Sequence, residues 1–107
     1  MIARIWKGAT RAVDAEAYVR YLRETGFRAF RETAGNLGAL GLRRIVDGKA
    51  EFVVVSFWES EEVVRNFAGD DIGRAVFYAE DDRFLVERDP HVDHFEVVHR
   101  DEPARLS

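Results

Sequence analysis

The chain contains no cysteine and only two prolines among its 107 residues. The absence of cysteine excludes disulfides, zinc–thiolate sites, iron–sulfur clusters and a cysteine nucleophile. Long apolar runs are also missing, since no stretch approaches the roughly 20 residues that cross a bilayer. The N-terminal segment 1–7 has too short an apolar part to resemble a signal peptide. We therefore expect a cytoplasmic protein that does not associate with a membrane.

Positively charged residues are not in excess either. The net charge is −4, which argues against nucleic acid as a main partner. The charge is unevenly spread, because residues 1–49 carry ten Lys/Arg against five Asp/Glu and residues 50–107 carry six against fifteen. A basic first half can grip an anionic ligand. Alternatively, the halves attract each other within the fold or across a dimer, and this interpretation is favoured because such charges usually lie on solvated faces.

The composition is that of a folded domain, with 47% hydrophobic and 34% charged residues. We expect one domain over 1–100 and a flexible tail over 101–107. Alternating apolar residues predict a first strand over 2–7, ended by Gly8-Ala9-Thr10. An apolar stripe at helical spacing follows, with Asp14 as its N-cap. Gly26 interrupts this stripe at a cost of about 1 kcal/mol relative to Ala, which predicts a break before a second short helical piece.

The middle of the chain predicts a β-hairpin. Strands are expected over 37–46 and 51–58, and Asp47-Gly48 between them is the strongest hairpin signal in the sequence. Both faces of 51–58 are apolar over most of its length, which is typical of a central strand covered on both sides.

The second half predicts a helix that begins after Ser60 and ends at Gly69. Beyond it, an aspartate at 70 or 71 can cap a short helix through Ala75, and residues 80–86 can form another helical turn. Pro90 precedes a last strand over 91–99.

This order is β-α-β-β-α-β, an α+β arrangement of the ferredoxin-like type. It predicts a four-stranded antiparallel sheet with both helices on one face. The other face is then bare, although strand 51–58 is apolar on that side too. We therefore expect a homodimer that forms through the open sheet face.

Three short motifs carry a resemblance to a known family. They are Phe57-Trp58-Glu59-Ser60 at a strand–helix junction, Gly35-Asn36-x-Gly38 after the first helix, and His91-Val92-x-His94-Phe95-Glu96-Val97 near the end. In this order and spacing, from residue 2 to residue 98, the chain resembles the antibiotic biosynthesis monooxygenase (ABM-like) superfamily. The resemblance implies a dimeric α/β barrel with a pocket between each sheet and its helices. Members include cofactor-independent oxygenases of aromatic polyketides, quinol oxygenases and haem-degrading enzymes.

The sequence departs from the haem-degrading members. Those resemble each other in an Asn on the first strand, a Trp late in the second helix and a His just beyond it. Here the first strand carries Arg4 and Trp6, the late-helix position is Phe67, and Phe77-Tyr78 lies beyond it. None of the three positions matches, which argues against haem degradation, and we expect no cofactor. Trp58 of the family motif is interpreted as a packing residue at the strand end.

The last predicted strand contains all three histidines. His94 and Glu96 share one face of it, while His91, Asp93 and His99 share the other. His94 with Glu96 can act as a general base with its orienting carboxylate. Alternatively, the two can supply two metal ligands, but the spacing of the sequence places no third ligand beside them. The favoured interpretation is that both are polar contacts at the dimer interface.

Arg4 and Trp6 share a face of the first strand, and the pair suits a flat, anionic aromatic ligand. An aromatic wall and a phenol donor can come from the residues Tyr18, Tyr21, Phe67, Phe77 and Tyr78. The alternative is plain core packing, favoured for Tyr21 and Phe67. The candidate catalytic residues are therefore His94, Tyr78 and Arg4, and the candidate binding residues are Trp6, Tyr18, Tyr21, Phe67, Phe77 and Glu96. The acids at 70–71 and 80–82 lack calcium-loop spacing and are interpreted as helix starts or solvated charges.

Two functions stay open at this point. The first is a cofactor-independent monooxygenase, or a related small enzyme, acting on an aromatic or polyketide-like molecule. The alternative is a non-catalytic dimeric domain that binds a small ligand or is associated with stress. An open cavity on which Arg4, His94 and Tyr78 converge would favour the enzyme, and a space filled by side chains would favour the alternative.

Overall fold

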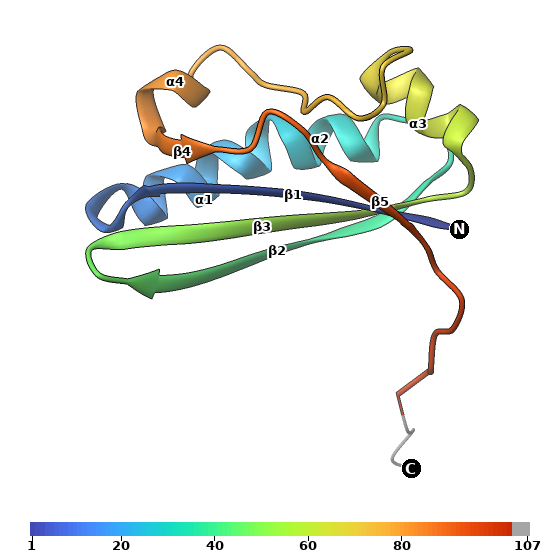
Figure 1. Cartoon of the computed structure of the whole chain (residues 1–107), viewed down its shortest axis with the longest axis horizontal. Coiled ribbons are helices and arrows are strands. Elements are labelled where there is room, and N and C mark those ends of the chain that lie inside the picture. The colour runs from blue at the N-terminus through green and yellow to red at the C-terminus, as the bar shows by residue number, and fades with distance from the viewer. Residues whose placement is uncertain (104–107) are drawn as a thin grey trace.

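Five antiparallel strands form one sheet, and the helices lie on one of its faces (Figure 1). This computed structural model describes residues 1–103; residues 104–107 of the predicted tail lie outside the described part. In chain order the elements are β1 (Ile2–Arg11), a 3-10 turn η1 (Ala12–Asp14), α1 (Ala15–Glu24), α2 (Gly26–Arg31), β2 (Asn36–Val46), β3 (Lys49–Trp58), α3 (Glu61–Ala68), α4 (Asp81–Phe84), β4 (Leu85–Arg88) and β5 (Asp93–Glu96). None of the helices in residues 1–103 is long and apolar enough to cross a membrane.

The sheet order confirms the predicted α+β, ferredoxin-like fold. The strands follow the order β2-β3-β1-β4, with β5 also paired to β1. As predicted, β3 is central and joins β2 through a tight turn, in which Asp47 and Gly48 adopt positive φ of 50° and 77°. In the single chain the sheet has two free edges and is not a closed barrel.

The predicted last strand over 91–99 is present but shorter, as β5, and the strand β4, which was not predicted, shares the fourth sheet position with it. β4 pairs with Gly8–Thr10, and β5 pairs with Ile2–Ile5. Between them Asp89 still bonds to β1, because its amide donates to the Lys7 carbonyl at 3.0 Å and its carbonyl accepts from Trp6 Nε1 at 2.9 Å. The predicted helical turn over 80–86 is likewise limited to α4, because the residues that follow α4 pair with β1 as a strand.

The first strand is longer than predicted, and Gly8-Ala9-Thr10 continues it instead of ending it. These residues are paired on both sides, with β3 and with β4, so their ladder bonds offset the low strand propensity of Gly8 and Ala9. Gly8 has a packing role here. A Cβ at this position would lie 2.4 Å from Cη2 of Trp6, so the absent side chain leaves room for the Trp6 ring.

Most of the predicted helix signals are confirmed, and one is wrong. The predicted break occurs at Thr25, which separates α1 from α2, and Ser60 caps α3 by accepting from the Val63 amide at 3.3 Å. Asp14 occupies the N-cap position of α1 as predicted, although its side chain makes no capping hydrogen bond and accepts from Arg11 Nε at 3.1 Å. No helix forms over 70–75. That segment bonds to the chain beside it, through Ala75 N to Pro90 O and Val92 N to Gly73 O.

Two clusters of buried side chains fill the space between sheet and helices. One is centred on Tyr18, Phe52 and Phe84, and the other on Phe30 and Trp58. Trp58 is completely buried, which agrees with its interpretation as a packing residue. The segment between α3 and α4 runs over the same side of the sheet (Figure 1).

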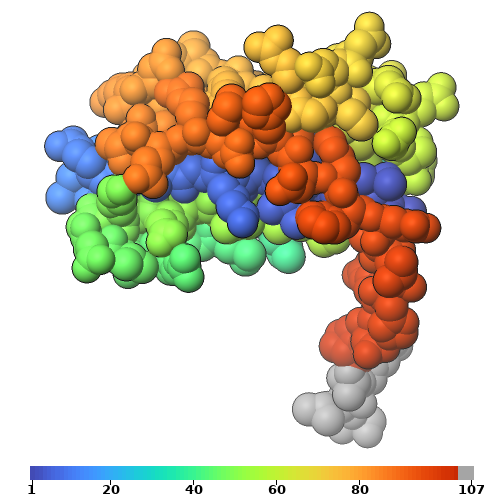
Figure 2. All heavy atoms as spheres, in the orientation of Figure 1, coloured from blue at the N-terminus to red at the C-terminus, as the bar shows by residue number. Residues whose placement is uncertain are grey.

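The opposite face of the sheet is apolar and uncovered in the single chain. Register places Leu40, Val55 and Ile5 side by side across β2, β3 and β1 on this face. Leu40 and Phe95 are 54% and 57% exposed. Beyond β5 the last described residues leave the body of the molecule as an extended arm (Figure 2). The open face that patterning predicts is therefore present.

Candidate functional site

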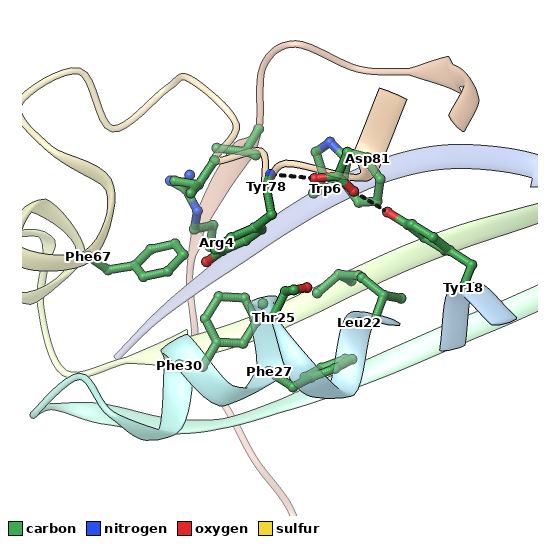
Figure 3. Close-up of a pocket in the computed structure, with 14 residues that line it drawn as sticks. Arg4, Trp6, Tyr18, Leu22, Thr25, Phe27, Phe30, Phe67, Tyr78 and Asp81 are labelled. Carbon is green, nitrogen blue, oxygen red and sulfur yellow. Dashed lines mark hydrogen bonds between the residues drawn. The ribbon is translucent and has the colours of Figure 1, made fainter. Parts of the chain in front are cut away.

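A small cavity lies between the sheet and the helices, under the segment that joins α3 to α4 (Figure 3). It encloses about 60 Å³ and its lining is mostly apolar. The lining residues are Arg4, Trp6, Tyr18, Leu22, Thr25, Gly26, Phe27, Phe30, Val54, Phe67, Val76, Tyr78, Asp81 and Val92. Two charged side chains, Arg4 and Asp81, interrupt this apolar wall.

Arg4 is a buried cation with no carboxylate partner among residues 1–103. It lies on the helix-facing side of β1 and is 4% exposed. Its guanidinium donates from Nη1 to the Ile72 carbonyl at 2.5 Å and from Nη2 to the Arg74 carbonyl at 2.9 Å. The Phe67 ring centre lies 5.8 Å from the guanidinium carbon. Burial lowers the pKa of Arg4 to about 10, so the group still carries its charge near neutral pH.

His94 touches Arg4 and is not part of the cavity lining. Its Nε2 lies 3.0 Å from Arg4 Nη1, and because a guanidinium only donates, Nε2 is the acceptor and the ring proton is on Nδ1. Burial and the neighbouring Arg4 charge lower the pKa of His94. The lone pair that a general base needs is therefore already engaged. Within the described residues no hydrogen bond joins His94 to Glu96, which is exposed opposite Ile2.

The half-buried His94, which accepts from Arg4 in its neutral form, predicts an acid-sensitive fold. Its pKa is lowered from 6.5 in the folded chain, so this contribution to stability is fully present above about pH 6.5 and is lost as the pH falls through the lowered value. The charged groups that act on His94 are Arg4, Glu61 and Asp93. We expect His94→Gln, whose amide oxygen can still accept from Arg4, to flatten the fall in unfolding free energy below pH 6.5. Urea unfolding across pH 5 to 8 measures this.

The exposed histidine His99 provides the control for that experiment. It pairs with Asp101 on the extended arm, away from the cavity. His99→Gln is expected to leave the pH profile of stability unchanged. An identical profile for His94→Gln and the parent chain would show that His94 does not titrate against Arg4.

Asp81 is the second buried charge of the cavity and was not among the predicted site residues. It is 5% exposed, and both of its oxygens accept hydrogen bonds: Oδ1 from the Tyr18 hydroxyl at 3.1 Å and Oδ2 from the Tyr78 amide at 2.6 Å. Burial, with the nearby Asp81 charge, raises the pKa of both Tyr18 and Tyr78. Both phenols are therefore hydrogen-bond donors at neutral pH and not bases.

The predicted site residues fall into two groups. Those that line the cavity together are Arg4, Trp6, Tyr18, Phe67 and Tyr78. The remaining four do not line it. Tyr21 accepts from the Glu80 amide at 2.9 Å, and Phe77 packs edge-on against Trp6 with ring centres 6.2 Å apart. His94 contacts Arg4, and Glu96 is exposed.

The sheet order and the cavity between sheet and helices define a ferredoxin-like α+β protein with an internal site. No family model matches the chain, and no curated protein matches it significantly. Solved structures do match it, and among them are proteins of the ABM-like fold that the sequence resembles.

One such structure is a putative antibiotic biosynthesis monooxygenase from Bacillus cereus, with a TM-score of 0.62 and 20% identity over 95% of this chain and 97% of that chain. Another is the haem degrader MhuD from Mycobacterium tuberculosis with two haems bound in its active site, with a TM-score of 0.59 and 23% identity over 95% of this chain and 100% of that chain. A mutant of MhuD with two manganese protoporphyrin IX molecules bound per active site gives a TM-score of 0.60 at 22% identity, over 96% and 100% of the two chains. At these identities the comparisons confirm the resemblance at the level of fold.

The cavity of this chain does not fit haem. Haem iron takes an axial His, Cys, Met or Tyr ligand. Within the described residues the cavity lining contains no His, Cys or Met, and its two tyrosines, Tyr18 and Tyr78, have raised pKa values that disfavour the phenolate form. The enclosed 60 Å³ is also far below the roughly 300 Å³ or more of sites for drug-sized ligands. We therefore derive no chemistry through haem.

Proposed function

We propose that the cavity binds a small planar aromatic molecule in an anionic, phenolate- or enolate-type form, and that the chain oxidises it with dioxygen without a cofactor. The observation that carries this proposal is the buried Arg4 cation, which has no carboxylate partner in residues 1–103. Removing a cation from water costs several kcal/mol unless an anion or strong dipoles compensate it. The Ile72 and Arg74 carbonyls compensate the Arg4 charge with dipoles alone, and a ligand oxyanion beside Arg4 would add the missing anion.

The rest of the lining supports an aromatic ligand. Trp6, Phe67 and Tyr78 provide flat apolar surfaces, and Arg4 lies against the Phe67 ring in the manner of a cation–π pair. Guanidinium groups recognise flat oxyanions through paired N–H donors, and the three contacts of Arg4 leave further N–H groups for a ligand.

Ligand entry requires the covering segment to move. The enclosed 60 Å³ is less than the roughly 150 Å³ of a cavity that holds benzene. The segment 70–80 over the cavity contains no helix or strand. Segments without regular structure open at lower free energy than core strands, so outward movement of this segment is the expected route of entry.

The proposed reaction needs only the substrate and dioxygen. The bound anion, stabilised by Arg4, passes one electron to dioxygen, and the resulting substrate radical and superoxide combine through a new C–O bond to a hydroperoxide anion. Protonation of this peroxide and loss of water then break the O–O bond. The oxygenated substrate carbon, which began as a ring CH₂, has lost both of its hydrogens and becomes a carbonyl carbon. One oxygen atom enters the product and the other leaves as water, so dioxygen is the oxidant and no electron donor is required.

The second candidate is binding of the same ligand without turnover. It is favoured by the state of His94, whose Nε2 already accepts from Arg4 and so is not free to take a proton from the ligand. Without a histidine base beside the cavity, turnover depends on a ligand that arrives ionised.

A thermal-shift screen of phenolic and quinone compounds, followed by oxygen-uptake measurements on each binder, separates the two candidates. Oxygen consumption without added cofactor, with water and a quinone as products, supports the oxygenase. A clear binder that takes up no oxygen leaves the binding protein. Failure of every anionic aromatic compound to bind would overturn both.

We also infer that two copies pair through the open sheet face. The apolar residues on this face include Leu40, Leu42, Val55 and Phe95, and exposed apolar surface of this kind is normally covered in a soluble protein. Two sheets that pack face to face bury the same residues on both copies, which satisfies two-fold symmetry.

Sedimentation tests the pairing. We expect the unmodified chain to sediment as a dimer at micromolar concentration and Val55→Glu to sediment as a monomer, because the carboxylates would be buried in the middle of the interface. Val13→Glu, at an exposed position outside the sheet, is the matched control and should stay dimeric. A monomeric unmodified chain would contradict the inference.

A further inference from the structure

Three consecutive acids, Glu80, Asp81 and Asp82, stand at the start of α4, and only the middle one is buried without a cation. Glu80 pairs with Arg83 at 3.2 Å and Asp82 pairs with Arg88 at 2.5 Å, so the two flanking acids engage the nearby guanidinium groups. Asp81 pairs with no cation in the described part of the chain, although it is 5% exposed. A buried carboxylate without a cation is costly and is retained only where hydrogen bonds or a ligand compensate it.

Two fixed donors hold the Asp81 carboxylate in one orientation. The Tyr18 hydroxyl comes from α1 and the Tyr78 amide from the covering segment, so the carboxylate is clamped from both sides. Each carboxylate oxygen accepts more than one hydrogen bond, so both oxygens of Asp81 have capacity left. Asp81 is therefore a preorganised acceptor at the wall of the cavity.

The two buried charges lie at different ends of the cavity. In Figure 3, Arg4 lies at the end beside Phe67, and Asp81 lies at the end beside Tyr18, with Tyr78 between them. A ligand that occupies the whole cavity therefore meets a cationic donor at one end and an acceptor at the other. Its own groups must have the opposite character at each end to avoid unpaired buried polar atoms.

We propose that the ligand is an aromatic anion with a second, un-ionised hydroxyl at its far end, which donates to Asp81. This inference rests on the proposed function, since it specifies the class of molecule that Arg4 holds. A hydroxyl fits better than an ammonium group, because an ammonium must lose much more hydration to enter an apolar cavity. Asp81 is then the specificity-determining residue for hydroxylated over plain aromatic anions.

Titration calorimetry with matched probes tests this on the full chain. The probes are benzoate, its three hydroxy isomers and their O-methyl ethers, and the corresponding pairs built on 2-naphthoate. We expect at least one hydroxylated probe to bind about tenfold or more tighter than both its plain and its methylated partner, as a hydrogen bond to a charged acceptor provides. Asp81→Asn should bring this ratio close to one. Asp82→Asn, at the neighbouring exposed acid, should leave it unchanged.

Each other outcome has a distinct meaning. If no probe binds the unmodified chain, the proposed function fails and this inference fails with it. If plain anions bind and no hydroxyl improves affinity, this inference alone is overturned, and that result needs no variant and so does not depend on whether Asp81→Asn folds. A ratio that persists in folded Asp81→Asn also overturns it, as does tighter binding of 4-(aminomethyl)benzoate than of every hydroxylated probe.

Discussion

Replacing Trp58 by alanine is expected to lower the free energy of unfolding by about 3–5 kcal/mol, the usual cost of removing a large buried aromatic side chain. Trp58 is completely buried at the end of β3. Its ring centre lies 5.7 Å from that of Phe30 in α2 and 5.3 Å from that of Phe67 in α3. One side chain therefore joins the sheet to two helices, and its removal leaves a cavity that separate elements must close together.

Part of the Trp58 effect comes from its ring nitrogen. Nε1 donates to Ser56 Oγ at 2.8 Å, and both atoms are buried. Trp58→Phe keeps most of the ring packing and leaves the serine hydroxyl without that donor, so it should cost less than Trp58→Ala. Leaving a buried polar group without its hydrogen-bond partner lowers the free energy of unfolding by about 1–3 kcal/mol.

Chemical unfolding measures these differences, with Val13→Ala as the control at an exposed position. The control is expected to change the unfolding free energy by no more than about 0.5 kcal/mol. A loss of less than about 1 kcal/mol in Trp58→Ala would contradict the packing role. The presence of the Trp58-Glu59-Ser60 motif, through which the chain resembles the ABM-like superfamily, would then need an explanation other than packing.

The sequence predicts the part of the fold that depends on local periodicity. The hairpin at Asp47-Gly48, the central position of 51–58 and the helix capped by Ser60 all follow from patterns within a few residues of each other. The segment 70–99 was predicted poorly, because its structure depends on distant partners. Residues 85–88 form a strand only because the far end of the first strand offers them a free edge.

The candidate site, too, could be predicted from the sequence only in part. Arg4 and Trp6 could be placed together, because strand alternation puts them on one face. Asp81 could not be distinguished from Glu80 and Asp82, since three adjacent acids give the same signal and only the tertiary contacts bury the middle one. His94 was correctly placed on the face of Glu96, yet alternation says nothing of its contact with Arg4 across the strand pair.

Removal of the Arg4 charge is expected to give the largest change in ligand binding. Arg4→Met keeps a long side chain but removes the cation and the donors to the Ile72 and Arg74 carbonyls. Loss of one partner from a buried, hydrogen-bonded charge pair costs about 2–5 kcal/mol. We therefore expect the affinity for the best-binding aromatic anion to fall by about 30-fold or more, while the affinity for its neutral carboxamide changes by less than about threefold.

This difference between anion and amide separates a binding role of Arg4 from a purely structural one. If Arg4 only ties the covering segment to the sheet, its loss disturbs the cavity and weakens both probes alike. Arg74→Met is the matched control, because Arg74 is an exposed cation on the same segment and should leave both affinities unchanged. Equal losses for the anion and the amide in Arg4→Met would contradict the proposed function, because they would show that the buried charge is not compensated by the ligand.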